Sequence, residues 1–263
     1  MKLKGWKENW KVNLPNNEQW VKQVDFIYKD ENDVTIKATE KAEPWKEYKL
    51  NWVIYYVAKD KEDIQKKLKE KYPANRIVTT FVTDMSMLFY KQFEITLINH
   101  NVSNWDVSNV TDMCSMFEWY ASFNCNINDW DVSKVKDMYW MFAWCQKFDS
   151  PLNKWNVSNV ENMINMFAHT YVFNQDIWDW DVSKVKAFIH MFYWAEKFNN
   201  WWSDSIKKWK FRSWAQMDWM FQYAREFNQN ISTWKTSWIS THRDFFDWVN
   251  PYWPKHFQPK FLK

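Results

Sequence analysis

The sequence predicts an α/β repeat fold, a solenoid whose turns each hold one short parallel strand and one short helical turn, preceded by a small α+β cap. The segment DWDVSKVKDMYWMFAWCQKF returns fifty residues later as DWDVSKVKAFIHMFYWAEKF. The motif Trp-[Asp/Asn]-Val-Ser-[Asn/Lys]-Val recurs at intervals of 25 residues. A strict period of this length is typical of stacked repeats and too short for a two-helix unit. We therefore expect a leucine-rich-repeat-like solenoid.

Aligned on this period, the repeats place like residues in columns that predict a stacked core. These structural ladders are a tryptophan column (Trp105, Trp130, Trp155, Trp180), an acidic or amide column (Asp106, Asp131, Asn156, Asp181), a methionine column (Met113, Met138, Met163) and a phenylalanine column (Phe117, Phe142, Phe167, Phe192). The carboxylates would repel one another unless each served a local purpose. We expect each to accept hydrogen bonds from backbone N–H groups two or three residues on, with Lys134 and Lys184 offsetting the charge. A calcium ladder is the alternative.

The same pattern gives the expected domain organisation. Residues 1–21 read as a loose leader, residues 22–78 as an α+β cap, residues 79–250 as a solenoid of about seven rungs, and residues 251–263 as a C-terminal tail. In the cap we expect strands at 33–38 and 49–58 and a helix at 59–72 with Asp60 as its N-cap. In each rung we expect a strand near positions such as 109–113, a helical or 3₁₀ turn over the Met-Phe pair, and an extended return such as 126–130.

Composition and motifs argue against most kinds of chemistry. The net charge is +3 and the basic residues are spread along the chain, which does not favour nucleic-acid binding. No stretch of 18 apolar residues predicts a membrane span, and the first twenty residues do not read as a signal peptide. A single glycine leaves no phosphate-binding loop, the histidines lack metal-ligand spacing, and the cysteines form no CxxC pair. We expect no catalytic residue, no cofactor, no metal site and no enzymatic activity.

The most promising interaction surface is the set of variable positions beside the core columns. On the expected strand face these are Thr111, Lys136, Glu161, Lys186, Asp112, Asp137 and Asn162. Solenoids use such positions to present extended binding surfaces. We therefore predict a binding face there.

At this level the repeats resemble a known family. The segments WDVSNVTDMCSMF, WDVSKVKDMYWMF and FNQDIWDWDVSKV are similar to the repeats of BspA-like bacterial surface proteins, common in mycoplasma-type lipoproteins, and the resemblance spans roughly residues 80–246. It implies display on the cell surface or secretion, and adhesion or recognition of a protein on another cell surface. A glycan-binding module that stacks sugars on Trp144 and Trp194 is the alternative, and an intracellular scaffold is a third possibility.

The tryptophans raise a separate hypothesis about the sequence. Trp52, Trp140 and Trp144 stand where members of the resembling family carry glycine, and Trp140, Trp178 and Trp219 fall in columns otherwise filled by polar turn residues. The chain has 23 tryptophans and one glycine. We expect that many of these tryptophans are UGA codons that the native ribosome reads as glycine, whereas Trp105 and Trp130 are true tryptophans.

Overall fold

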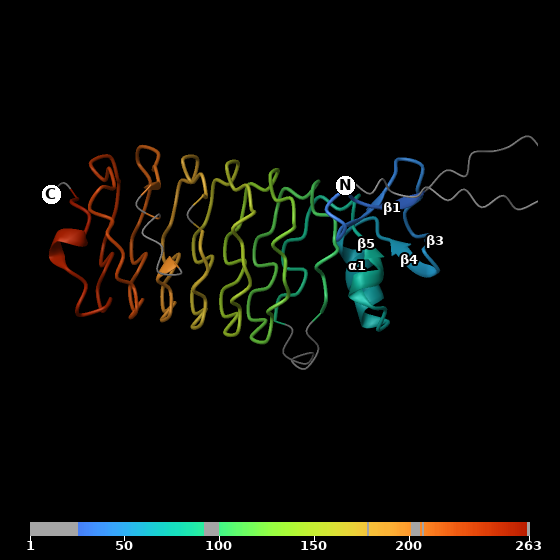
Figure 1. Cartoon of the computed structure of the whole chain (residues 1–263), viewed down its shortest axis with the longest axis horizontal. Coiled ribbons are helices and arrows are strands. Elements are labelled where there is room, and N and C mark those ends of the chain that lie inside the picture. The colour runs from blue at the N-terminus through green and yellow to red at the C-terminus, as the bar shows by residue number, and fades with distance from the viewer. Residues whose placement is uncertain (1–25, 92–99, 178, 201–205, 207, 262–263) are drawn as a thin grey trace, which may run out of the picture.

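The computed structural model describes residues 26–91, 100–177, 179–200, 206 and 208–261, and Figure 1 shows their arrangement. Antiparallel strands β1 (Ile27–Lys29) and β2 (Ile36–Ala38) form one small sheet. In the other, β3 (Glu47–Leu50) pairs antiparallel with β4 (Val53–Val57), and β4 pairs parallel with β5 (Ile77–Val78). Helix α1 (Lys61–Lys69) and the 3₁₀ helix η1 (Ala74–Arg76) connect β4 to β5. These elements form one end of the molecule.

Helix α1 begins and packs as its sequence predicts. The Asp60 side chain accepts a hydrogen bond from the backbone N–H of Asp63, which caps the helix N-terminus. Ile64 is fully buried, and the Asp63 carboxylate accepts a hydrogen bond from the hydroxyl of Tyr56 at 2.7 Å. Lys61 joins the helix to the first repeat through an ion pair with Asp84 at 2.6 Å.

The second predicted strand, 49–58, is wrong as a single element. Leu50 pairs with Val53, so a two-residue loop of Asn51 and Trp52 turns the chain back between β3 and β4. Both loop residues have positive φ angles, 47° and 66°. This is the geometry of a type I′ hairpin turn, for which Asn-Gly is the preferred sequence. The turn was not predicted from the sequence because tryptophan, and not glycine, stands at the second position of the loop.

The predicted fold class is also wrong. The described part of the chain has one α-helix and two small sheets, all before residue 79, and the repeats contain neither the expected strand nor the expected helical turn. Two residues per repeat explain the missing helical turn, because Ser115 and Trp119, with φ of 53° and 66°, interrupt it. Asp112 explains the missing strand, because its side chain accepts the N–H of Cys114 and closes a local turn.

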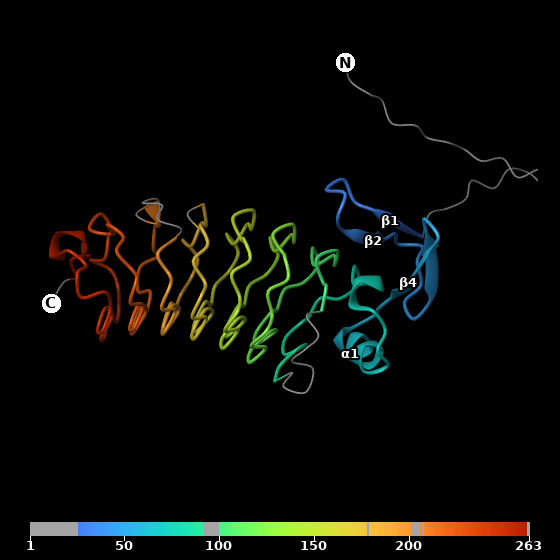
Figure 2. The same cartoon turned by 60° about the horizontal axis from the view of Figure 1, so that its bottom comes forward.

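The repeats instead stack as turn-rich coils that meet at isolated parallel bridges. The bridges follow one column through the molecule: Asp84, Asp112, Asp137, Asn162, Ala187, Gln216 and Thr241. Figures 1 and 2 show these coils side by side in a row that leads away from the cap. We call this row, within the described residues of 79–250, the repeat stack.

Two rows of parallel phenylalanine rings fill the interior of the repeat stack. Phe89, Phe117, Phe142, Phe167, Phe192 and Phe221 form the first row, with neighbouring ring centroids 5.3–5.7 Å apart. Phe123, Phe148, Phe173, Phe198 and Phe227 form the second, at 5.7–6.1 Å. All are essentially buried. Offset parallel rings add attraction beyond burial, so the two rows hold successive coils in register.

The far end of the repeat stack is covered by the C-terminal segment, which includes the 3₁₀ helix η4 (Lys255–Phe257). Trp253 is buried there and donates its indole N–H to the carbonyl oxygen of Gln229 at 2.8 Å. Phe261 stacks on His242 with 4.1 Å between ring centroids. The apolar interior therefore has a cover at both ends.

Candidate binding face

The predicted binding face lies along the bridge column of the repeat stack. Backbone hydrogen bonds run from Lys136 N to the Thr111 oxygen, from Glu161 N to Lys136, and from Lys186 N to Glu161, at 2.8–2.9 Å. Thr111, Lys136 and Lys186 are exposed and Glu161 is half-buried. The backbone ladder therefore places these side chains in one row, which we call the bridge face together with the neighbouring Asp112, Asp137 and Asn162.

The side chains of the three neighbouring residues are bonded to the local backbone, so they stabilise the coil and are less available to a partner. Each side chain of Asp112, Asp137 and Asn162 accepts the backbone N–H two residues ahead, at 2.8–3.1 Å. All are half-buried, and burial raises the pKa of the Asp112 carboxyl, with Asp137 and Asp84 acting in the same direction. These residues fix the turns that hold the row of Thr111, Lys136, Glu161 and Lys186 in place.

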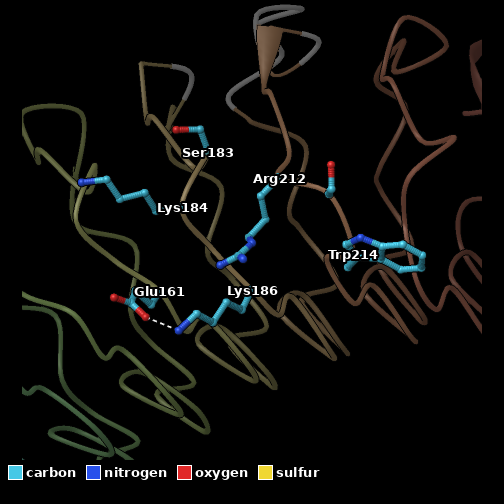
Figure 3. A pocket seen from close by; sticks show the side chains of 7 residues that line it. Glu161, Ser183, Lys184, Lys186, Arg212 and Trp214 are labelled. Carbon is cyan, nitrogen blue, oxygen red and sulfur yellow. Dashed lines mark hydrogen bonds and ion pairs between the residues drawn. The ribbon is translucent and has the colours of Figure 1, made fainter.

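A groove opens between the coils at the C-terminal part of the bridge face (Figure 3). It measures about 460 Å³ and is lined by Glu161, Ser183, Lys184, Lys186, Arg212, Ser213 and Trp214. Lys186 forms an ion pair with Glu161, and the Arg212 side chain extends toward that pair. Lys184 and Arg212 were not among the predicted face residues. The column of Lys134 and Lys184 carried a signal for the former, whereas Arg212 stands in the column otherwise filled by Ser108, Ser133, Ser158 and Ser183, which carried none.

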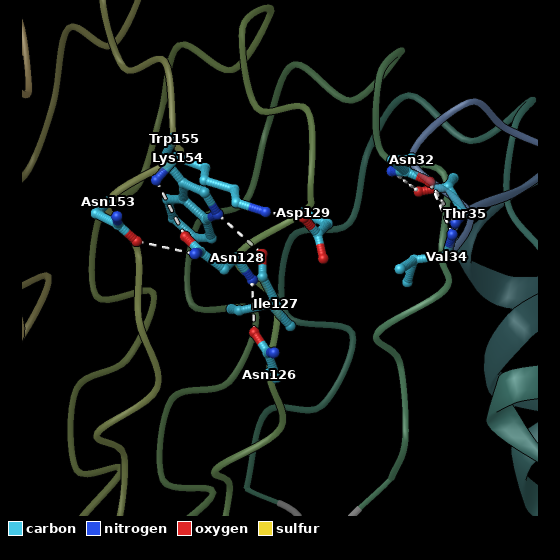
Figure 4. Close-up of polar contacts among 10 residues, drawn as sticks. All are labelled: Asn32, Val34, Thr35, Asn126, Ile127, Asn128, Asp129, Asn153, Lys154 and Trp155. Carbon is cyan, nitrogen blue, oxygen red and sulfur yellow. Dashed lines mark hydrogen bonds and ion pairs between the residues drawn. The ribbon is translucent and has the colours of Figure 1, made fainter. Parts of the chain in front are cut away.

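The predicted tryptophan ladder is buried and linked from coil to coil by its indole groups. Trp130, Trp155 and Trp180 donate their indole N–H groups to the carbonyl oxygens of Val102, Ile127 and Leu152 in the preceding coil, at 2.9–3.2 Å. Trp105 makes the same bond to Ala74 of η1. Figure 4 shows the bond from Trp155, beside the side-chain link from Asn128 to Asn153. The methionine and phenylalanine ladders are buried beside them.

The acidic column closes local turns. Asp106, Asp131, Asn156 and Asp181 each accept the backbone N–H of the serine two residues ahead, at 3.0–3.1 Å. The side chain of Ser183, followed by its backbone N–H, is the main cause that lowers the pKa of Asp181. Lys134 and Lys184 donate to the amide oxygens of Asn109 and Asn159, and the charge of Lys184 also lowers the pKa of Asp181, as expected of a lysine that offsets this column.

A further column, of aromatic rings, shares no residue with the bridge face. It comprises Trp119, Trp144, His169, Trp194, Tyr223 and Trp248, and we call it the aromatic column. Trp144 is stacked on Trp119 at 4.3 Å and on His169 at 3.7 Å, so both faces of its indole are covered. Sugar stacking needs an open face, and Trp144 does not offer one. Burial lowers the pKa of His169 to about 4, and His190 adds to the shift.

Within the described residues, no three histidine, cysteine, aspartate or glutamate side chains gather as metal ligands. Cys114, Cys125 and Cys145 are free thiols, as predicted, and burial raises the pKa of each. In the described part of the chain, no helix is long and apolar enough to cross a bilayer.

Comparison with known families gives one match. The model of a family described as "Mycoplasma protein of unknown function, DUF285" matches residues 62–171, 125–205 and 145–252, in overlapping segments that cover the repeat stack and helix α1. The chain belongs to the DUF285 family. The overlapping matches agree with a DUF285 unit that itself spans several 25-residue repeats. No curated protein and no solved structure matches the chain.

Proposed function

We propose that this DUF285 protein is a non-enzymatic recognition protein, secreted or displayed on a bacterial surface like the BspA-like repeat proteins, and that it binds a partner protein through the bridge face. The observation that supports this most directly is the row of Thr111, Lys136, Glu161 and Lys186. A continuous backbone ladder fixes these side chains, yet three of them are exposed.

The chemistry of the row suits protein recognition. Its positions carry a hydroxyl, two ammonium groups and a carboxylate, while the neighbouring columns are occupied by core and turn residues. Rigid presentation lowers the entropy lost on binding, because the backbone under each side chain is already ordered. Alternating charges contribute more to the selectivity of binding, by matching a complementary surface, than to its affinity.

The test is an adhesion assay with beads that carry the purified chain and with target cells. Protease treatment of the target cells should abolish attachment, whereas glycosidase treatment should leave it intact. The triple substitution Thr111→Ala, Lys136→Ala and Glu161→Ala should weaken attachment by about tenfold or more. Lys147→Ala and Lys154→Ala, two exposed lysines outside this row, provide the matched control. Attachment that survives the triple substitution, or that glycosidase abolishes, would contradict the proposal.

A further inference from the structure

The groove of Figure 3 differs from the rest of the bridge face in its charge. Lys184, Lys186 and Arg212 line it beside a single carboxylate, that of Glu161. The neighbouring hollow along the stack is lined by Lys136 and Lys186 and by Asp137 and Glu161, so its charges balance. The excess of positive charge is therefore local to the coils around Arg212.

The partners of these cations leave much of the charge available. Lys184 donates to a neutral amide, that of Asn159, at 2.6 Å. Arg212 is exposed and forms no ion pair with the residues that the structure describes. Lys186 alone pairs with Glu161, whose pKa is lowered by Lys186 and further by Lys136 and Arg212. The carboxylate of Asp181 is an acidic neighbour of Lys184. Lys210 is also close to Asp181 and adds positive charge to this region.

Resting on the proposed function, we propose that this groove, which we call the basic groove, binds an acidic peptide segment of the partner protein. The planar guanidinium of Arg212 suits a carboxylate in a two-point contact, and the nearby ammonium groups add charge without demanding one geometry. A peptide is favoured over an acidic sugar because Glu161 and Lys186 of the groove belong to the bridge face, which is proposed to bind a protein.

The experiment is fluorescence anisotropy with a labelled peptide of alternating glutamate and serine, using the full chain. A glutamine version of the peptide is the probe control. Arg212→Gln and Lys186→Gln should each weaken binding about tenfold, and salt should weaken it further. Lys154→Gln removes the same charge outside the groove and should leave binding within about twofold.

Equal loss with Lys154→Gln, or equal affinity for the glutamine peptide, would overturn the proposal. Binding to heparin without binding to the peptide would overturn it in favour of an acidic glycan. Repeating the adhesion assay with Thr111→Ala and Lys136→Ala alone, two residues outside the basic groove, distinguishes a protein-binding bridge face whose groove binds no peptide from failure of both proposals.

A second inference rests on backbone angles. Nine tryptophans have positive φ: Trp45, Trp52, Trp119, Trp140, Trp144, Trp194, Trp214, Trp219 and Trp248, between 56° and 67°. The left-handed region is unfavourable for residues with a Cβ atom and is the ordinary place for glycine. The buried ladder tryptophans Trp105, Trp130, Trp155 and Trp180 do not share this conformation.

The pattern extends through the repeat stack. Each coil has two positive-φ positions four residues apart, and the other occupants of the first column include Ser115, Asn165 and Asp244, small or turn-forming residues. In the cap, Trp52 follows Asn51 in a type I′ turn that prefers Asn-Gly. We infer that these nine positions are glycine in the native protein. The basic groove does not depend on this, because its cations are Lys184, Lys186 and Arg212.

Peptide sequencing of the protein purified from its native cells tests the inference. We expect glycine at positions 52, 140 and 144 and tryptophan at 105 and 130. Tryptophan at 52 and 140 would overturn it. A second measurement uses the chain made with the printed sequence: Trp52→Gly should raise the folding equilibrium constant about fivefold, and Trp52→Ala should not. A Trp52→Gly variant less stable than the parent would count against the inference as well.

Discussion

Trp155 lies parallel to Trp180, with 6.3 Å between ring centroids and 5° between ring planes, and donates its indole N–H to Ile127 of the preceding coil. One side chain thus joins three successive coils: its own, the one it stacks on, and the one it bonds. The stacking recurs where Trp209 lies parallel to Trp234 at 6.1 Å, and there it is Trp234 that donates its indole N–H, to Ile206. This relationship explains why the repeat keeps tryptophan at this position.

Trp155→Phe should lower the free energy of unfolding by about 1–3 kcal/mol, because it removes part of the ring and the indole N–H bond to the Ile127 carbonyl, which then keeps only the N–H of Trp130. Urea unfolding followed by circular dichroism measures the change. Trp238→Phe is the control, since Trp238 is 67% exposed, and we expect it to change stability by less than about 0.5 kcal/mol. Equal effects of the two substitutions would contradict the role given to the ladder.

Two aspartates of the acidic column offer a matched comparison. Asp106 is 2% exposed and accepts hydrogen bonds from both the N–H and the hydroxyl of Ser108, at 3.1 and 2.6 Å. Asp131 is exposed and accepts the N–H of Ser133. Asp106→Ala should therefore destabilise the protein by about 1.5–3 kcal/mol, and Asp131→Ala by less than about 1 kcal/mol. Thermal unfolding of both variants gives the comparison; a larger loss with Asp131→Ala would refute it.

The lowered pKa of His169 predicts that the stability of the protein depends on pH. Its pKa is about 4 in the folded chain, below the ordinary value of about 6.5 for the unfolded chain. Between these values the unfolded state binds a proton that the folded state does not, so stability falls as pH decreases from about 6.5 toward 4. His190 shifts in the same direction, because burial outweighs the opposing effect of Asp218.

The measurement is urea unfolding at pH 7 and pH 5 of the chain with the printed sequence and of His169→Asn. Asparagine tolerates the positive φ of 60° at this position and does not titrate. The loss of stability on acidification should be smaller in the variant, with the remainder due to His190 and His100, whose pKa is also lowered by burial. An unchanged loss would show that His169 takes up its proton equally in both states.

The sequence was sufficient for the period and for the columns. Its repeated Trp, Asp, Met and Phe positions are those that become the indole ladder, the turn-closing carboxylates and the buried rows. The sequence led to a wrong prediction for the backbone between these columns, where a strand and a helical turn were expected. The spacing of apolar residues around Ser115 and Trp119 suited a helical turn, but spacing does not reveal positive φ angles.

Two further differences have identifiable causes. The β3–β4 hairpin was missed because tryptophan at position 52 conceals an Asn-Gly-type turn. Arg212 was missed because it stands in a column that holds serine in the other repeats, so its place in the basic groove follows only from the folded chain. Both errors arise where the local sequence departs from the repeat or from ordinary turn composition.

The central claim is that equivalent residues of successive repeats are direct neighbours along the bridge face. Lys136→Cys combined with Glu161→Cys tests it, because bridge-paired backbones lie about 5 Å apart, within the reach of a disulfide. Mild oxidation followed by tryptic peptide mapping should recover a linked 136–161 peptide in high yield. The pair Lys136→Cys and Lys186→Cys, two coils apart, should give none. Linkage of the distant pair, or failure of the adjacent pair to link in a folded protein, would contradict the stacking.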